Sequence, residues 1–139
     1  MRQRSAVALS GVPLFSGFSK RHFKLLVEST DEVVFSSGET MVEEGLLGET
    51  LFVVLEGQAK VVRGGRTVAR IVPGDFFGEL SALDGGPRSA SVIAETPLVA
   101  VRLFRHALLD LVRAEPILSA HLLQGMARRI REIERPLSG

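Results

Sequence analysis

The chain of 139 residues contains no cysteine, and it has only three histidines. The lack of cysteine excludes disulfides, thiolate metal sites and cysteine nucleophiles. The histidines, His22, His106 and His121, are scattered along the chain, which argues against a shared metal or catalytic site. We therefore expect no metal, no cofactor and no catalytic residues.

An excess of charge of one sign is also missing, as are long apolar runs. The 17 basic and 16 acidic residues are interspersed and give a net charge of +1, so the balance does not favour a nucleic-acid partner. Unbroken apolar runs reach about five residues, as at 51–55, whereas a membrane span needs roughly 18 or more. The apolar run near the N-terminus is also shorter than the roughly 7–15 residues of a secretory signal. We expect a cytoplasmic protein that binds no membrane.

The pattern along the chain predicts a single α+β domain over residues 1–139. Residues 1–30 are expected to be helical, and Ser19 is suited to cap a helix. Residues 31–103 contain short runs rich in Val, Ile and Phe with a glycine turn signal every 7–12 residues, which indicates a small antiparallel sandwich or roll. Gly64-Gly65 predicts a two-residue hairpin, and Pro73-Gly74 suits a type II turn.

The last part of the chain, residues 104–135, is expected to form C-terminal helices. Apolar residues recur there at helical spacing, which predicts a core stripe of Leu118, Leu122, Met126, Ile130 and Ile133. Whether part of this stripe also forms a dimer seam stays open. The charged residues between Arg128 and Glu134 are interpreted as a solvated face of mixed charge. Pro136 and Gly139 are expected to end the helix.

One stretch, from Phe76 to Val92, combines residues that suit a phosphorylated sugar. Gly78 allows a close approach to the backbone, and the residues after it can form one helical turn whose leading N–H groups suit a phosphate. Arg88 follows a chain reversal and supplies the fork of donors that fits a phosphate. The Glu79 carboxylate suits a ribose hydroxyl, since acidic residues accept such a hydroxyl in dinucleotide folds.

This stretch resembles the phosphate-binding cassette of the cyclic nucleotide-binding domain family, which includes bacterial catabolite activators, kinase regulatory subunits and nucleotide-gated channels. The likeness rests on Phe77-Gly78-Glu79-Leu80-Ser81-Ala82-Leu83 and on Pro87-Arg88-Ser89-Ala90-Ser91-Val92. Further similarity covers residues 12–134, including Phe52-Val53-Val54-Leu55-Glu56-Gly57 and Ala127-Arg128-Arg129. The resemblance implies an antiparallel β-roll (a double-stranded β-helix, jelly-roll-like) with short N-terminal helices, an internal cassette helix and C-terminal helices, without an attached DNA-binding or channel domain.

The resemblance also implies a role for individual residues. Arg88 is expected to pair with the cyclic phosphate, and Glu79 to accept the ribose 2′-hydroxyl. Further ligand contacts are expected from Gly78, Leu80, Ser81, Ser89 and Ala90. The wall or lid of the pocket is expected to include Phe77, Ala82, Val92, Ile130 and Ile133.

The resemblance does not by itself decide between cAMP and cGMP as the ligand. In the kinase-related branch a threonine after the cassette arginine goes with cGMP and an alanine with cAMP, so Ser89 leans to cAMP and leaves cGMP open. Bacterial members hold adenine with hydroxyl residues on the last helix, where this chain has Ile133 and Glu134. We therefore expect an apolar lid that discriminates only modestly between related ligands.

The expected function is that of a cyclic-nucleotide sensor whose last helix moves on binding and acts on a second copy or a partner protein. One alternative is a degenerate β-roll that serves only as an interaction module. The other is a cupin-type metalloenzyme, which would need several histidines and a glutamate on neighbouring strands. No histidine occurs between Asp31 and Leu103, which argues against that enzyme.

Overall fold

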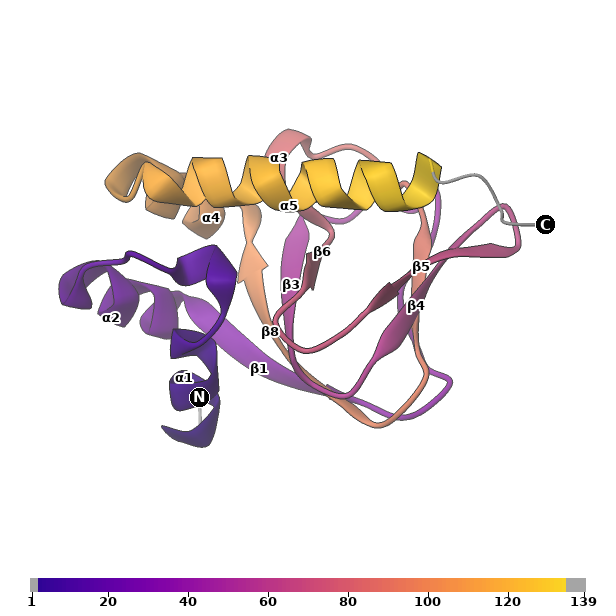
Figure 1. Ribbon diagram of the computed structural model, residues 1–139, viewed down its shortest axis with the longest axis horizontal. Coiled ribbons are helices and arrows are strands. Elements are labelled where there is room, and N and C mark those ends of the chain that lie inside the picture. The colour runs from indigo at the N-terminus through magenta and orange to yellow at the C-terminus, as the bar shows by residue number, and fades with distance from the viewer. Residues whose placement is uncertain (1–2, 135–139) are drawn as a thin grey trace.

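The structure, a computed structural model, describes residues 3–134, so the predicted helix end at residues 135–139 lies outside it. Its helical N-terminal part consists of α1 (Gln3–Ser10), the 3-10 helix η1 (Pro13–Phe15) and α2 (Lys20–Ser29). The predicted cap of α2 is confirmed, because the Ser19 hydroxyl accepts a hydrogen bond of 3.2 Å from the backbone N–H of His22. These helices pack together at one end of the molecule (Figure 1).

Within the described residues, the strands form two four-stranded antiparallel sheets, in the orders β1-β8-β3-β6 and β2-β7-β4-β5 (Figure 1). The strands are β1 Thr30–Phe35, β2 Thr40–Val42, β3 Thr50–Glu56, β4 Ala59–Arg63, β5 Arg66–Ile71, β6 Phe76–Phe77, β7 Ser91–Ala94 and β8 Leu98–Phe104. A short helix, α3 (Glu79–Asp84), lies between β6 and β7 in the chain. The predicted α+β class and antiparallel β-roll are confirmed.

The two predicted turns are present in the roll. Gly64 and Gly65 have φ of +57° and +78°, values that a type I′ hairpin requires, and they join β4 to β5 with Arg63 opposite Arg66. Gly74 has φ of +93°, and the backbone N–H of Asp75 donates to the Val72 carbonyl over 3.0 Å, as expected for a type II turn. The turn at Gly74 thus brings β6, and the cassette that follows it, alongside β3.

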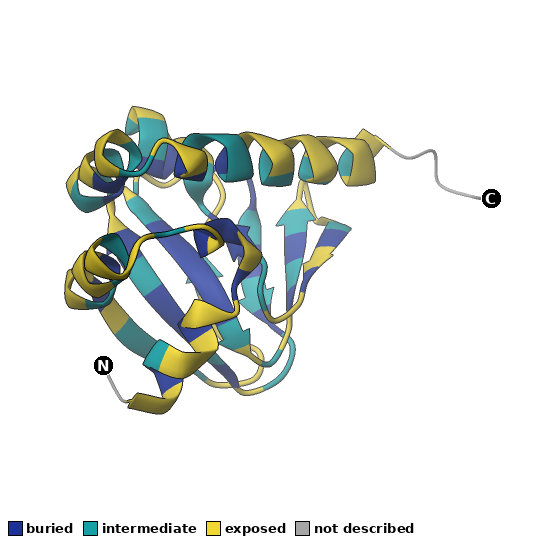
Figure 2. Ribbon diagram, turned by 60° about the vertical axis from the view of Figure 1, so that its left-hand side comes forward, coloured by how far each residue is buried: buried dark blue, intermediate teal, exposed yellow. Residues whose placement is uncertain are grey.

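The buried side chains form two clusters, one on each side of the sheet that contains β3 and β8. Figure 2 shows buried residues both in the strands of the roll and in the helices beside it. The first lies between that sheet and the helices and includes Leu9, Leu26, Leu51, Val53, Leu103, Leu108 and Leu118. The second fills the roll and includes Val54, Ala59, Ile71, Phe77, Val92, Ala94 and Leu98. Alternate residues of β3 point into different clusters, as the period of two along a strand requires.

The C-terminal helices are α4 (Arg105–Ala114) and α5 (Ile117–Glu134). The predicted apolar core stripe is correct only for the first half of α5, where Leu118 and Leu122 are buried. Met126 is half-buried and Ile130 is 54% exposed, because the second half of α5 leaves the helical end and extends over the mouth of the roll (Figure 1). The first half of α5 therefore packs in the core, and the second half covers the roll.

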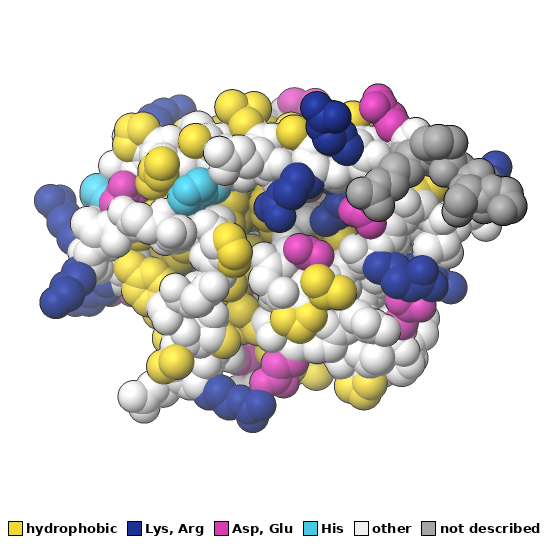
Figure 3. Space-filling view, in the orientation of Figure 1, with side chains coloured by type: hydrophobic (Ala, Val, Ile, Leu, Met, Phe, Trp, Pro, Cys, Tyr) yellow, Lys and Arg dark blue, Asp and Glu magenta, His cyan; other side chains and the backbone are white. Residues whose placement is uncertain are grey.

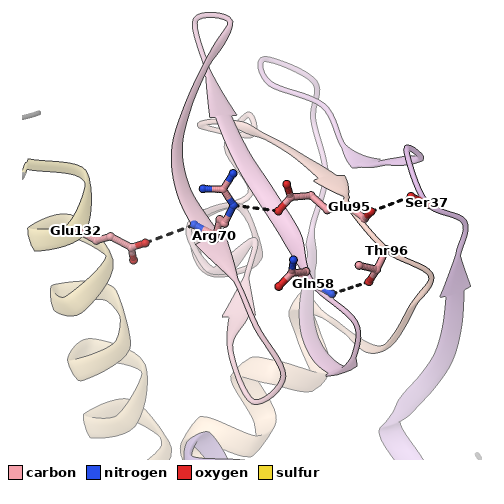
Figure 4. A network of polar contacts seen from close by, with 6 residues as sticks. All are labelled: Ser37, Gln58, Arg70, Glu95, Thr96 and Glu132. Atoms are coloured by element: carbon pink, nitrogen blue, oxygen red, sulfur yellow. Dashed lines mark hydrogen bonds and ion pairs between the residues drawn. The ribbon is translucent and has the colours of Figure 1, made fainter.

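The far end of α5 is attached to the roll by polar contacts. The backbone N–H of Arg70 on β5 donates to the Glu132 carboxylate over 3.4 Å, and the Arg70 side chain pairs with Glu95 at 3.2 Å (Figure 4). Side chains of both signs lie interspersed over this face of the molecule (Figure 3). No helix within residues 3–134 combines the length and the apolar character needed to cross a membrane.

Candidate functional site

The cassette begins at Gly78, whose backbone conformation and surroundings both require glycine. Its φ of +84° lies in the left-handed region, which residues with a Cβ rarely adopt. A Cβ there would lie 2.6 Å from the Thr50 carbonyl oxygen and 2.7 Å from Nη1 of Arg88. The predicted helical turn is present as α3, which starts directly after Gly78, so its first N–H groups have no partner within the helix.

One pocket brings together the residues that were predicted to bind the ligand. It lies between the cassette, β2, β4, the start of β7 and the end of α5. Its lining contains Gly78, Glu79, Leu80, Ser81, Arg88, Ser89 and Ala90, together with the predicted wall residues Phe77, Val92 and Ile133. Positions far apart in the sequence thus converge where the cassette faces α5.

Two predicted wall residues lie elsewhere. Ala82 does not line the pocket, because it is on the inner face of α3, fully buried in the helical core. Ile130 does not line it either, because its side chain is on the exposed face of α5, three residues before the position that does line the pocket, Ile133. The predicted lid therefore reduces to Ile133.

Arg88 is held at the pocket by the backbone around it. Its side chain is almost fully buried, and Nη1 donates to the carbonyls of Thr50 and Gly78 over 2.9 and 3.3 Å. Burial lowers the pKa of Arg88 and the charge of Glu79 raises it, but an arginine keeps its charge at physiological pH. Within residues 3–134, Nε and Nη2 have no protein partner, and no fully buried side-chain nitrogen lacks one, so these two donors must remain accessible.

Glu79 is the only carboxylate among the described residues that line the pocket. Burial raises the pKa of its carboxyl, and this effect outweighs its own backbone N–H and the charges of Arg129 and Arg88, which lower the pKa. The ionised carboxylate therefore lacks part of the stabilisation that water gives it, and it can gain from a donor that a ligand brings.

Arg129 is the site residue that the sequence interpretation missed. It had been assigned to a solvated charged face, but its side chain is only 18% exposed and it lines the pocket. Its Nη2 donates to the Phe76 carbonyl over 3.5 Å, and its Nε lies 3.7 Å from the Glu132 carboxylate. Consecutive helix residues are about 100° apart around the axis, so Arg129 and its neighbour Arg128 differ in surroundings.

The charge and size of the pocket indicate what it can bind. Three arginines, Arg63, Arg88 and Arg129, face a single glutamate, so the pocket suits an anion. It encloses about 60 Å³ of free space, whereas pockets for drug-sized ligands have roughly 300–1,000 Å³. The free space bounded by Arg129 and Ile133 is thus smaller than that of a typical ligand pocket.

Comparison with known proteins agrees with the resemblance found in the sequence. Residues 32–115 match the family described as "Cyclic nucleotide-binding domain". The chain is 35% identical to the Cyclic AMP receptor protein of Thermus thermophilus over 134 residues, which are 93% of this chain and 62% of the relative. It is 33% identical to a CRP-like cAMP-activated global transcriptional regulator of Mycobacterium tuberculosis, covering 94% of this chain and 60% of that one.

Solved structures agree with this match. The Thermus thermophilus catabolite activator protein has a TM-score of 0.76 and 36% identity, covering 86% of this chain and 59% of that chain. A cyclic nucleotide-binding domain from Methylobacillus flagellatus has a TM-score of 0.77 and 30% identity, covering 92% and 77%. The chain spans about three fifths of the length of the two bacterial regulators it matches.

Proposed function

Because the chain belongs to the cyclic nucleotide-binding domain family, we propose that it is a regulatory module that binds a cyclic nucleotide, cAMP in the first place, in the pocket between the cassette and α5. The observation that carries the proposal is the convergence of Arg88, Glu79 and the start of α3 on one cationic pocket. The matched relatives are regulators, which favours a sensor over an enzyme.

In this proposal each part of the nucleotide has its own partner. The free Nε and Nη2 donors of Arg88 and the leading N–H groups of α3 bind the cyclic phosphate. The negative charge of the phosphate balances the excess of arginines over carboxylates in the pocket. Ser89 and Ala90, which follow Arg88 and precede β7, add further contacts. Glu79 accepts the 2′-hydroxyl of the ribose, and this bond supplies the donor that its buried carboxylate needs.

The regulatory output is a movement of α5. Arg129 and Ile133 close a pocket too small for a nucleotide, and Arg129 is tied to the backbone of Phe76 next to the cassette. A nucleotide that displaces this wall and then packs against it shifts the balance between positions of the helix, since its affinity differs between them. The first half of α5, anchored by Leu118 and Leu122, stays in the core while the second half moves.

A second copy of the chain is the proposed reader of that movement. Leu123 and Ile130 are 65% and 54% exposed, and Ala127 between them is exposed as well. The spacing of these positions, four and then three residues, places them on one helix face, the pattern by which two helices pair. Analytical ultracentrifugation should detect a dimer, and Leu123→Glu combined with Ile130→Glu should yield monomers that still bind nucleotide.

Titration calorimetry on nucleotide-stripped protein tests the binding. Heat of binding with cAMP is expected, and cGMP is measured alongside it. Amide hydrogen exchange over residues 117–134 should slow when the nucleotide is added, because the displaced end of α5 packs against the ligand. No binding of either nucleotide would contradict the proposal and favour a degenerate interaction module, whereas equal exchange with and without ligand would contradict only the movement of α5.

A further inference from the structure

Arg63, the last residue of β4, lies on the inner face of the roll at the mouth of the pocket. Ala59 and Val61 on the same strand are buried, and the period of two places Arg63 on the same face as both. Val61 pairs with Val92 of β7 and the next residue of β4 pairs with Ser91. The same register continued by one residue brings Arg63 level with Ala90 of the cassette.

The backbone that carries Arg63 is anchored on both sides. The backbone N–H of Gly64 donates to the Glu44 carboxylate over 3.1 Å. The backbone N–H of Glu44 in turn donates to the Ser91 hydroxyl of β7 over 2.9 Å. The tip of the β4–β5 hairpin is therefore fixed relative to the cassette, so the side chain of Arg63 starts from a defined point beside the pocket.

Among the arginines of the pocket, Arg63 is the one whose side chain is unused. Arg88 donates to two backbone carbonyls, and Arg129 contacts the Phe76 carbonyl and Glu132. Within residues 3–134, the guanidinium of Arg63 makes no hydrogen bond and no ion pair, although it lines the pocket. Its donors are therefore available to the part of a ligand that the cassette does not bind.

We propose that Arg63 contacts the base of the bound nucleotide and strengthens the binding of guanine more than that of adenine, so that cGMP is a ligand besides cAMP; the inference rests on the proposed function. The cassette supplies partners for the phosphate and ribose, and Ile133 offers the base only packing. Guanine presents two acceptors, O6 and N7, side by side, whereas adenine presents N7 beside an amino group that is itself a donor. A guanidinium has donors only, so its fork matches guanine and opposes the adenine amino group.

The test is calorimetry of the whole chain, stripped of nucleotide, with cAMP, cGMP and cIMP. Arg63→Ala should weaken cGMP binding by about tenfold or more beyond any loss of cAMP affinity, because removal of a charge that lines the pocket affects both nucleotides and loss of the bidentate base contact affects only cGMP. cIMP, whose base keeps O6 and N7 but lacks the 2-amino group, should behave as cGMP does. Arg63→Lys should recover only part of the loss.

Arg66 provides a matched control, because it is an arginine directly opposite Arg63 in the same hairpin and does not line the pocket. Arg66→Ala removes the same charge nearby and should change none of the affinities. An equal loss of cAMP and cGMP in Arg63→Ala would overturn the inference and leave the proposed function intact. So would unchanged cGMP binding in that variant, or cAMP binding by the unmodified chain without any cGMP binding. Absence of all nucleotide binding by the unmodified chain would instead refute the proposed function.

Discussion

Gly125, in the middle of α5, provides a sharp test of how that helix is seated. Glycine inside a helix ordinarily costs about 1 kcal/mol relative to alanine, so Gly125→Ala on a free helix should stabilise the protein. In this structure a Cβ at Gly125 would lie 2.4 Å from Cζ and 2.5 Å from Cε1 of Phe76, far inside the roughly 3.5–4 Å of carbon contacts. Glycine is needed here because the Phe76 ring packs directly against the helix.

The magnitude follows from the two opposing effects. Phe76 is buried in the helical core and pairs with Val53 of β3, so its ring has little room to retreat. Overpacking of this kind costs about 1–3 kcal/mol, which exceeds the helix-propensity gain of about 1 kcal/mol. We expect Gly125→Ala to lower the free energy of unfolding by up to about 2 kcal/mol.

The same substitution should also strengthen nucleotide binding. Arg129 follows Gly125 by one helical turn, so a displaced helix draws its guanidinium away from the Phe76 carbonyl and opens the wall that the nucleotide must otherwise displace. A cost of about 2 kcal/mol borne by the closed, nucleotide-free state corresponds to a gain of up to about thirtyfold in affinity. Denaturant unfolding and calorimetry measure the two effects.

Ala127→Gly is the control, because Ala127 is exposed on the same helix and the change alters propensity without a clash. It should lower stability by about 1 kcal/mol. A Gly125→Ala variant that is more stable than the parent and binds nucleotide equally well would refute the reasoning.

Three further predictions concern the pocket. Arg88→Ala should weaken cAMP binding by more than tenfold and up to several thousandfold, since loss of one partner of a buried charge pair costs roughly 2–5 kcal/mol, and Arg88→Lys should recover part; calorimetry showing parental affinity for Arg88→Ala would place the phosphate elsewhere. The parent should prefer cAMP over 2′-deoxy-cAMP and Glu79→Ala should lose that preference, so a preference retained by the variant would exclude Glu79 as the sugar contact. Burial raises the pKa of Glu79, so the stability that its protonated form contributes is complete below the ordinary value of 4.5 and is lost as the pH rises through the folded-state pKa. Glu79→Gln should therefore stabilise the nucleotide-free protein at pH 7 and lose this effect below pH 4.5; thermal unfolding with the same difference at both pH values would contradict the assignment.

Local patterns in the sequence predicted most of the fold because each depends on near neighbours. The hairpin at Gly64-Gly65, the turn at Gly74 and the cap at Ser19 are all decided by backbone conformations that few residues allow. The cassette residues were found in the same way, as a continuous stretch whose spacing places them on one turn and one strand start. Their convergence in one pocket then follows from the antiparallel roll.

The residues that were misassigned all depend on which way a helix faces. Periodicity identified the apolar stripe of α5, but it could not tell that the core ends after Leu122 and that Ile130 is exposed. Ala82 lies inside the cassette motif, yet it is on the side of α3 that faces the core. Arg129 was missed for the same reason, since one of two adjacent arginines is directed at the roll only once the helix is docked.

The electrostatics of Glu79 and Arg88 connect binding to stability. Burial disfavours the charged form of each, as the raised pKa of Glu79 and the lowered pKa of Arg88 indicate, and the attraction between them offsets only part of that effect. A bound cyclic nucleotide would bring an anion to Arg88 and a hydroxyl donor to Glu79, so it would compensate both groups at once. The same two side chains that make the nucleotide-free protein less stable are then those that make it respond to the nucleotide, because a ligand that binds only the folded state stabilises that state by mass action. Substitutions that remove one of these buried charges, such as Glu79→Gln, should therefore raise the stability of the nucleotide-free protein while they weaken its response to the nucleotide.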